Sequence, residues 1–352
     1  MRTDRITMDH GAGGTLTLQL IKKHVLRNLG GSRFEVPLEA LDDAAVVNGI
    51  VLKSDSHTVK PLFFPGGDIG RLSVSGTVND IAMLGAEPVA LAAGMVLEEG
   101  LPLSDLERIL TSMKDACHEA GVWIVTGDTK VVEKGSLGGM IINTSGIGRH
   151  CEALERNLAV IKRFRPDFKA GWLLDSNLKP GDKIIVSGTI GDHGIALLSF
   201  REGYSFGYEL KSDVAPLNRL TLKLMDEVGG IVAMKDPTRG GLATSLNEWS
   251  EKSKVGILAR EEAIPIREGV KAACEMLGID PLEVGNEGKA VIGVIPEKAE
   301  EVLEALRSHP QGREAQIIGE ATSDHQDVIL QTQVGGRRLL PPPLGDPIPR
   351  IC

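Results

Sequence analysis

LDDAAVVNGIVLKSD, residues 41–55, holds two β-prone runs on either side of Asn48-Gly49. Asn-Gly between such runs predicts a β-hairpin, because both residues accept the positive φ angles of a type I′ turn. In this register Asp42 or Asp43 meets Asp55 at the open end of the hairpin. Like charges there would repel one another, and a bound Mg²⁺ would offset the repulsion. Solvated carboxylates at the strand ends are the alternative interpretation.

A further carboxylate lies in a predicted helix at residues 70–84. Four small, polar or acidic residues share one face of this helix: Ser73, Gly76, Thr77 and Asp80. Such a face lets a neighbouring backbone approach closely while it presents one carboxylate. This combination suits a site for phosphate and metal.

Two other motifs combine acidic residues with glycine. Gly127-Asp-Thr-Lys130 ends a predicted strand, and Lys235-Asp-Pro-Thr-Arg-Gly-Gly241 places Asp236 just before a predicted helix. Helix N-termini bind anions. Since the sequence contains no Walker A motif, a nucleotide would have to be held through metal ions on scattered carboxylates.

The order of predicted elements indicates an α+β fold with two domains, which is also what a length of 352 residues favours. Helices are predicted at residues 16–29 and 104–120, the second opened by a Ser104…Glu107 capping box and closed by Gly121. The expected divisions are an N-terminal domain, a polar linker, a second α/β domain and a mobile tail, at residues 1–150, 151–180, 181–335 and 336–352.

The composition disfavours several classes of partner. The formal net charge is -9 and the pI is near 5.5, which argues against docking on nucleic acid or on an anionic membrane. No apolar run approaches the length of a membrane span, and Met1 is followed by polar and charged residues. Four cysteines without a C-x-x-C pair suit a reducing compartment. We therefore expect a cytoplasmic protein.

The last residue of the sequence, Cys352, follows a stretch in which five of twelve residues are proline. Such a stretch is neither helix nor central strand, so it predicts an extended arm. At about 3.1 Å per residue the arm would reach on the order of 35 Å. Cys117 and Cys274 instead fall on the apolar stripes of predicted helices and are expected to be buried and inert.

The acidic motifs together resemble the ATP-binding superfamily of aminoimidazole ribonucleotide synthetase and selenophosphate synthetase. Other motifs resemble the HypE family of hydrogenase maturation factors, namely His10-Gly-Ala-Gly-Gly14, residues 59–67, Gly191-Asp-His-Gly194, Asn286-Glu-Gly-Lys289 and Pro349-Arg-Ile-Cys352. The resemblance implies a homodimer with a β-barrel-like core, and ATP bound between an N-terminal domain and its partner. It further implies an ATP-dependent carbamoyl dehydratase, a lyase that converts a carbamoyl group on Cys352 into a thiocyanate.

The resemblance also implies partners and residue roles. The carbamoyltransferase HypF would load the cysteine, and a HypC–HypD complex that carries iron would receive cyanide for nickel–iron hydrogenase. Cys352, Lys130 and Glu287 would be catalytic, with burial raising the pKa of Glu287 toward that of a working base. The expected nucleotide-binding residues are Asn79, Gly127, Asp128, Thr129 and Gly240. The expected Mg²⁺ ligands are Asp43, Asp55, Asp80 and Asp236.

Two alternatives stay open at this point. The first is a small-molecule kinase or synthetase of the same superfamily, such as a selenophosphate synthetase. That enzyme is expected to carry a reactive residue near its N-terminus, whereas this sequence has no cysteine before Cys117. The second is a non-enzymatic assembly factor, which would have no need of the acidic positions. His10, His57 and His193 lie in glycine-rich or acidic motifs, but none of them is assigned as a ligand.

Overall fold

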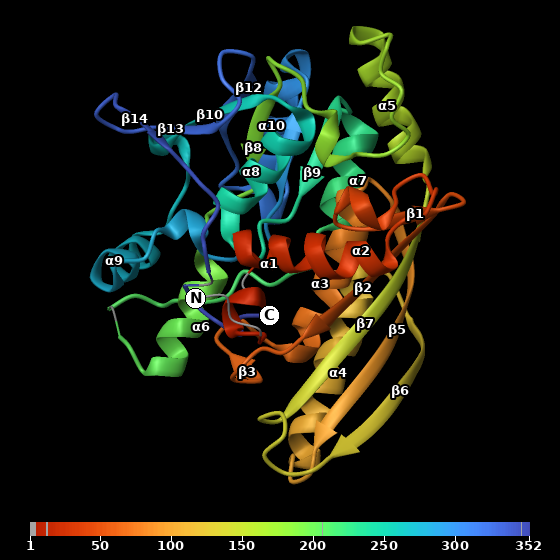
Figure 1. The fold of residues 1–352 in the computed structure, drawn as a ribbon, viewed down its shortest axis with the longest axis vertical. Coiled ribbons are helices and arrows are strands. Elements are labelled where there is room, and N and C mark those ends of the chain that lie inside the picture. The colour runs from red at the N-terminus through yellow and green to blue at the C-terminus, as the bar shows by residue number, and fades with distance from the viewer. Residues whose placement is uncertain (1–4, 12, 206, 346) are drawn as a thin grey trace.

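Two large β-sheets organise the chain (Figure 1). The computed structural model describes residues 5–11, 13–205, 207–345 and 347–352. The N-terminal sheet has the order β1-β2-β7-β5-β6 and is antiparallel except for the pair β5 and β6. Its strands are β1 (Ala45–Val47), β2 (Ile50–His57), β5 (Glu87–Glu98), β6 (Ile124–Val132) and β7 (Met140–Arg149). Within the described chain this sheet is open, with β1 and β6 at its edges.

The predicted hairpin is confirmed in β1 and β2. Asn48 and Gly49 have φ angles of 50° and 76°, and the strands pair from Val47 with Ile50 to Ala45 with Leu52. The expected pairing of residues 42 and 55 is wrong. The ladder ends at Ala45 and Leu52, because the chain bends at residues 43 and 44, where the Asp43 carboxylate binds the buried Lys235. On the other side of β2, Asp55 pairs with Thr144 of β7.

Helix α3 (Ile69–Met83) crosses the middle of the molecule, and every residue in it except Arg71 is buried. Asp68 caps its N-terminus by accepting hydrogen bonds from the backbone of Gly70 and Arg71, at 2.7 and 3.1 Å. Helix α4 (Leu103–Ala120) packs beside it. The expected capping box of α4 is wrong, since its N-cap is Pro102 without a side-chain cap. The predicted left-handed end at Gly121 is confirmed.

The C-terminal sheet has seven strands in the order β14-β13-β10-β12-β8-β11-β9. These strands are β8 (Lys183–Val186), β9 (Ile231–Lys235), β10 (Gly256–Arg260), β11 (Val291–Val294), β12 (Gln316–Thr322), β13 (Val328–Gln331) and β14 (Arg337–Leu339). The helices of this half are α6 (Asp192–Glu202), α7 (Asn218–Glu227), α8 (Gly241–Ser253), α9 (Glu268–Leu277) and α10 (Ala299–Arg307). A small ribbon, β3 (Phe63–Phe64) and β4 (Gly67–Asp68), precedes α3.

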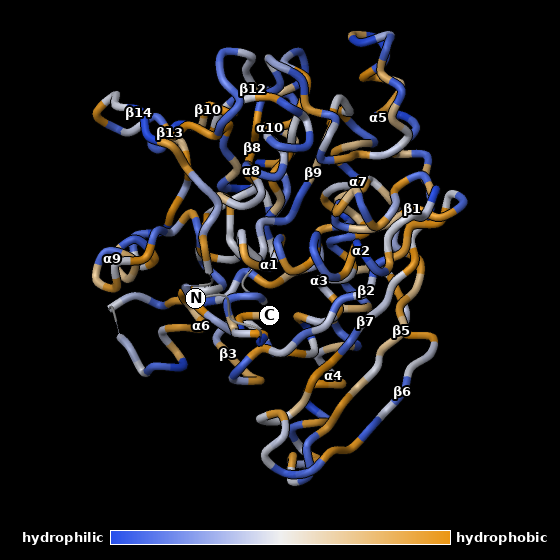
Figure 2. The backbone as a smooth tube through the Cα atoms, in the orientation of Figure 1, coloured by the Kyte–Doolittle hydropathy of each residue, from blue (hydrophilic) through white to orange (hydrophobic). Residues whose placement is uncertain are grey.

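The segment that was expected to be a linker is ordered. It contains α5 (Glu152–Phe164), whose hydropathy alternates along the helix (Figure 2). The buried Asn157 side chain exchanges hydrogen bonds of 2.8 and 2.9 Å with the backbone of Ile231 in β9. One hydrophobic cluster contains Val51 of the N-terminal sheet together with Leu158 and Ile231. The two halves therefore share a core, which holds the elements around the site in place.

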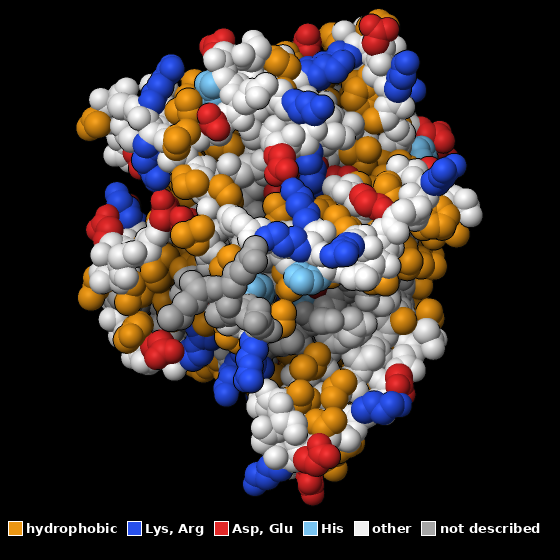
Figure 3. All heavy atoms as spheres, viewed as in Figure 1, with side chains coloured by type: hydrophobic (Ala, Val, Ile, Leu, Met, Phe, Trp, Pro, Cys, Tyr) orange, Lys and Arg blue, Asp and Glu red, His pale blue; other side chains and the backbone are white. Residues whose placement is uncertain are grey.

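The N-terminal residues form a helical segment that lies in front of both halves (Figure 1). It consists of α1 (Thr15–Leu20), a π-helical turn (Ile21–Val25) and α2 (Leu26–Leu29), as predicted for residues 16–29. Lys and Arg side chains gather over it on the face shown in Figure 3. Among the described residues, none of the helices has the length and apolar character needed to cross a lipid bilayer.

Candidate active site

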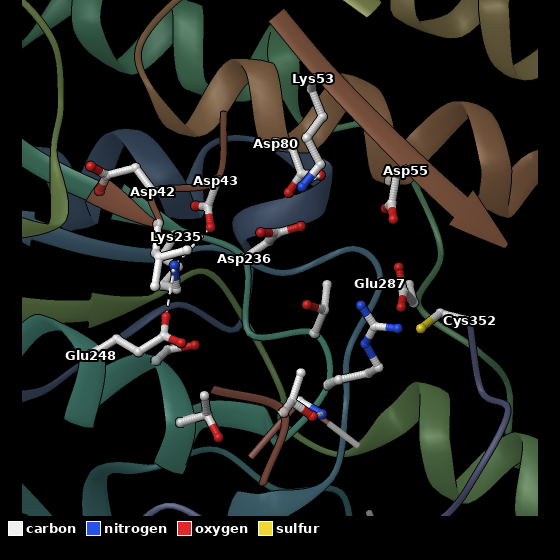
Figure 4. Close-up of a pocket in the computed structure, with 18 of the residues that line it drawn as sticks. Asp42, Asp43, Lys53, Asp55, Asp80, Lys235, Asp236, Glu248, Glu287 and Cys352 are labelled. Carbon is white, nitrogen blue, oxygen red and sulfur yellow. Dashed lines mark hydrogen bonds and ion pairs between the residues drawn. The ribbon is translucent and has the colours of Figure 1, made fainter. Parts of the chain in front are cut away.

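A cavity of about 250 Å³ lies where α3, the loop before β1, the loop after β9 and the tail converge. α1 and the start of the π turn close one side of it with Thr17, Leu18 and Ile21. Among the described residues, the remaining lining is largely polar and includes seven carboxylates (Figure 4). Cys352 also lines this cavity.

Three carboxylates from separate parts of the chain meet in the cavity. Asp43, Asp80 and Asp236 each offer an oxygen within 4.8 Å of the others, and Figure 4 shows them pointing toward one another. Asp80 comes from α3, and Asp236 from the turn between β9 and α8. Hard carboxylate oxygens in such a group suit Mg²⁺. Asp55 lines the same cavity but lies outside this group of three.

Burial makes these negative charges costly. It raises the pKa of Asp80 to about 7, although Lys53 acts in the opposite direction. Burial also raises the pKa of Asp236 well above its ordinary value, and the charges of Asp80 and Asp43 raise it further. Groups that hold protons this strongly lose them when a cation binds. The residues present therefore fit a divalent metal ion.

Two lysines already pair with these carboxylates. Lys53 Nζ lies 2.8 Å from Asp80 Oδ2, and Lys235 Nζ lies 2.7 Å from Asp43 Oδ1. Lys235 also lies 3.0 Å from Glu248 and 3.2 Å from Asp175. Lys235 is therefore surrounded by acceptors, whereas Lys53 pairs directly with Asp80 and lies within the influence of the Asp55 and Asp43 charges.

Asp175, from the segment expected to be a linker, binds Lys235 and so supports this group of charged residues. Its carboxylate accepts hydrogen bonds from Trp249 Nε1 at 2.7 Å and from Lys252 Nζ at 2.6 Å. Although burial raises the pKa of Asp175, Lys235 and Lys252 outweigh that effect and lower it. Asp175 is thus an ionised partner that helps to fix Lys235 beside the metal carboxylates.

The tail that was expected to be a mobile arm is docked in this structure. Thr58 donates to the main-chain oxygen of Cys352 from its backbone N–H at 3.0 Å and its hydroxyl at 3.1 Å. His193 Nε2 lies 2.7 Å from the carbonyl oxygen of Ile351. Ile348 and Ile351 are buried in the core. These contacts place the Cys352 thiol inside the cavity, on the side of Asp55 and Glu287 (Figure 4).

Glu287 faces the thiol from a buried loop. It is 3 % exposed, and its Oε1 has no hydrogen-bond partner among the described residues. Burial raises the pKa of Glu287 well above its ordinary value, and Asp55 and Asp213 raise it further. A carboxylate in such surroundings holds a proton strongly once it has accepted one.

The residues expected to bind nucleotide are spread over two regions. Gly240 is the N-cap of α8, next to the cavity, with a left-handed φ of 78°. Asn79 is buried and binds backbone instead, at Ala215, Leu217 and Glu287, where its bonds measure 3.1, 2.7 and 3.5 Å. The remaining three, Gly127, Asp128 and Thr129, belong to the exposed strand β6 and do not line the cavity; neither does Lys130 of the same strand, which was expected to be catalytic.

Sequence reasoning missed several residues of the site. Lys53 has a recognisable signal, because strand alternation places it on the same face as Asp55. Lys235 and Arg239 stand inside a motif that had been singled out for Asp236 and its glycines. Asp175 has no local signal at all, since its partners are more than 50 residues away.

Comparisons with known proteins agree with this architecture. Residues 41–150 match the N-terminal domain of AIR synthase related proteins, and residues 179–331 match the C-terminal domain. Carbamoyl dehydratase HypE of Azotobacter vinelandii is 45 % identical, over 100 % of this chain and 98 % of its own. A solved HypE in complex with ATP is 42 % identical with a TM-score of 0.79, covering 99 % of this chain and 100 % of its own. A HypE–HypF complex aligns with a TM-score of 0.83 at 46 % identity, covering 92 % and 99 %.

Proposed function

The chain belongs to the HypE family of carbamoyl dehydratases, and from that premise we propose how its residues convert a carbamoyl group on Cys352 into a thiocyanate with ATP. The observation that carries the proposal is the shared cavity. Cys352, Glu287 and the three carboxylates Asp43, Asp80 and Asp236 all line it.

The chemistry requires removal of oxygen from a primary amide. Oxide and hydroxide are poor leaving groups, so the γ-phosphoryl group of ATP is transferred to the carbamoyl oxygen. The carbon–oxygen bond then breaks, the oxygen leaves with phosphate, and the carbon–nitrogen bond becomes a triple bond. Two protons must leave the nitrogen. Glu287, which faces the thiol, accepts one of them, and the departing phosphate carries the other.

Asp43, Asp80 and Asp236 would hold Mg²⁺, with Asp55 completing the acidic wall beside them. The ion would supply positive charge to the triphosphate and to the phosphoryl group in transfer. Gly240 lies at the N-terminus of α8, where a side chain would meet Thr244 and the φ angle is left-handed. We place the phosphates of the nucleotide against the backbone N–H groups of this helix end.

A homodimer would complete the site. Strand β6 is an edge strand, and Val125 and Val131 on it are each 68 % exposed. An exposed apolar edge of this kind is typical of a surface that a second copy covers. Among the described residues, the one ion pair of Lys130 is with its neighbour Asp128, at 2.7 Å. We place Gly127, Asp128, Thr129 and Lys130 against the nucleotide of the partner subunit, with Lys130 stabilising the phosphoryl charge.

The docked tail implies a cycle with other proteins. While Ile348 and Ile351 are buried, the thiol stays inside the cavity, so we infer that the tail leaves the cavity to meet a carbamoyltransferase. HypF fits that role, because a solved HypE forms a complex with it. A HypC–HypD iron scaffold would receive the cyano group. All of this chemistry suits the reducing cytoplasm, since none of the four cysteines, all of them described, forms a disulfide.

Intact mass spectrometry tests the proposal. Protein carbamoylated on Cys352 should lose the mass of one water when Mg²⁺ and ATP are added, and the Cys352→Ala variant should show no carbamoylation. Verified loading and ATP binding without that loss would refute the dehydratase assignment. A small-molecule kinase, the remaining enzymatic alternative, would instead phosphorylate an external acceptor and leave the mass of Cys352 unchanged.

A further inference from the structure

Lys53 enters the cavity from the inner face of β2. Alternation along this strand places Lys53, Asp55 and His57 on one face, and all three line the cavity. Its ammonium lies 2.8 Å from Asp80, the same carboxylate that belongs to the group of three. One carboxyl group is thus shared between a lysine and the candidate metal position.

The cavity lining has more acidic than basic side chains. Seven carboxylates line it, from Asp42, Asp43, Asp55, Asp80, Asp236, Glu248 and Glu287, against the cations of Lys53, Lys235 and Arg239. Lys235 is held by Asp43, Asp175 and Glu248. The positive charge of Arg239 acts to lower the pKa values of Glu287 and Asp55. Lys53 is therefore the cation that forms the ion pair with Asp80.

We propose that the Lys53 ammonium takes the place of a second metal ion between Asp80 and Asp55, so that each site binds a single Mg²⁺ at Asp43, Asp80 and Asp236. The proposal rests on the proposed function, because it concerns the metal that accompanies ATP. A second divalent ion that used both Asp80 and Asp55 would have to approach Nζ of Lys53 against like charge. Asp55 lies outside the three-carboxylate group, and the positive charges that act on it are those of His57, 3.8 Å away, of Lys53 and of Arg239.

An ammonium and a metal ion differ in what they provide. Lysine supplies one positive charge and three hydrogen-bond donors at a position fixed by its stem. It has no open coordination position for a phosphate oxygen. Removal of the charge should therefore expose an oxygen-rich position that a hard divalent ion can fill.

The test is a count of bound Mn²⁺, a paramagnetic substitute for Mg²⁺, in the full-length protein saturated with a non-hydrolysable ATP analogue. Electron paramagnetic resonance gives the bound ions per bound nucleotide. We expect one ion in the wild type, one in Lys53→Arg and two in Lys53→Met. The double variant Lys53→Met/Asp55→Asn should return to one.

The outcomes distinguish a failure of the role given to Lys53 from a failure of the proposed dehydratase function. Equal counts in the wild type and Lys53→Met, with nucleotide bound, overturn the role of Lys53 and leave the dehydratase proposal intact. Two ions in the wild type do the same. A wild type that binds no nucleotide refutes the proposed function itself, and this inference with it.

A second measurement covers the case in which Lys53→Met folds poorly without metal. Ions that bind only the folded state raise the midpoint of thermal unfolding as their concentration increases. The midpoint of Lys53→Met should therefore rise more steeply with Mn²⁺ concentration than that of the wild type or Lys53→Arg. Equal slopes would overturn the proposal.

Discussion

The imidazole of His193 holds the carbonyl oxygen of Ile351 at 2.7 Å, and this contact joins α6 to the residue before the reactive thiol. His193 is fully buried, and its other ring nitrogen lies 2.7 Å from Ser212 Oγ. Burial lowers the pKa of His193, so the ring is neutral and donates from Nε2. A neutral hydrogen bond of this kind contributes about 1 kcal/mol.

His193→Gln should therefore loosen the docked tail without unfolding the protein. The backbone N–H of Thr58, which bonds Cys352, should exchange with solvent about fivefold faster, as a loss of about 1 kcal/mol implies. Hydrogen exchange followed by mass spectrometry measures this rate. His24→Gln, at an exposed position of the π turn, is the control. Unchanged exchange at Thr58 would show that His193 does not hold the tail.

Asp175→Asn should strongly destabilise the fold. It would leave Lys235 and Lys252 short of a buried negative charge, and breaking a buried pair costs about 3–5 kcal/mol. Urea unfolding at neutral pH measures the loss. The matched control is Asp226→Asn, which removes a half-exposed partner of Arg156 and should cost less than about 1 kcal/mol. Similar losses in both variants would contradict the role given to the Asp175 cluster.

Local patterns predicted the elements of the site better than their assembly. The Asn48-Gly49 turn and the polar face of α3 follow from interactions within a few residues, and both are confirmed. The meeting of Asp43, Asp80 and Asp236 depends instead on how two sheets pack over a shared core. Periodicity carries no information about contacts between residues so far apart in the chain.

The tail shows the same limit. Its prolines predict an extended backbone, but they do not say whether that backbone is free or bound. The available signal was its apolar content, because Ile348 and Ile351 are the residues that dock it. Likewise, the polar composition of residues 151–180 suggested a linker, while the apolar stripe of α5 packs it into the core.

Metal binding should strengthen as pH rises through neutrality. The folded pKa of Asp80 is raised to about 7, above its unfolded value of about 4, so its contribution to stability is present at low pH and lost as pH rises through 7. Asp43 and Asp236 are shifted in the same direction. The rise in unfolding temperature on adding Mg²⁺ should therefore be larger at pH 8 than at pH 6. Asp80→Asn should remove most of this dependence, and an equal effect of Mg²⁺ at both pH values would contradict it.

Glu287→Gln should abolish dehydration while the fold and ATP binding persist. The substitution keeps the shape of the side chain, and the backbone N–H of Glu287 that bonds Asp213 is unaffected. Loss of a general base lowers rates by about 10²–10⁴-fold. Single-turnover mass spectrometry of carbamoylated protein gives the rate, and equilibrium binding of an ATP analogue gives the control. A loss of less than about tenfold would assign the proton to another group.

Lys130 provides a test of the dimer that no change in one subunit alone can imitate. If Lys130 acts on the nucleotide of the partner subunit, the Lys130→Met and Glu287→Gln homodimers are both inactive. Both sites of the first lack Lys130, and both sites of the second lack Glu287. In a mixed dimer, one site receives Lys130 from the Glu287→Gln subunit and retains Glu287 of its own, so it is complete. Random mixing then restores about a quarter of wild-type activity, since half of the dimers are mixed and each has one working site.

Recovery requires subunit exchange or co-expression, and native mass spectrometry can verify that mixed dimers form. Mixed dimers without activity would place Lys130 in the same site as its own Glu287, and the exposed position of β6 would then need a movement within one chain to bring them together.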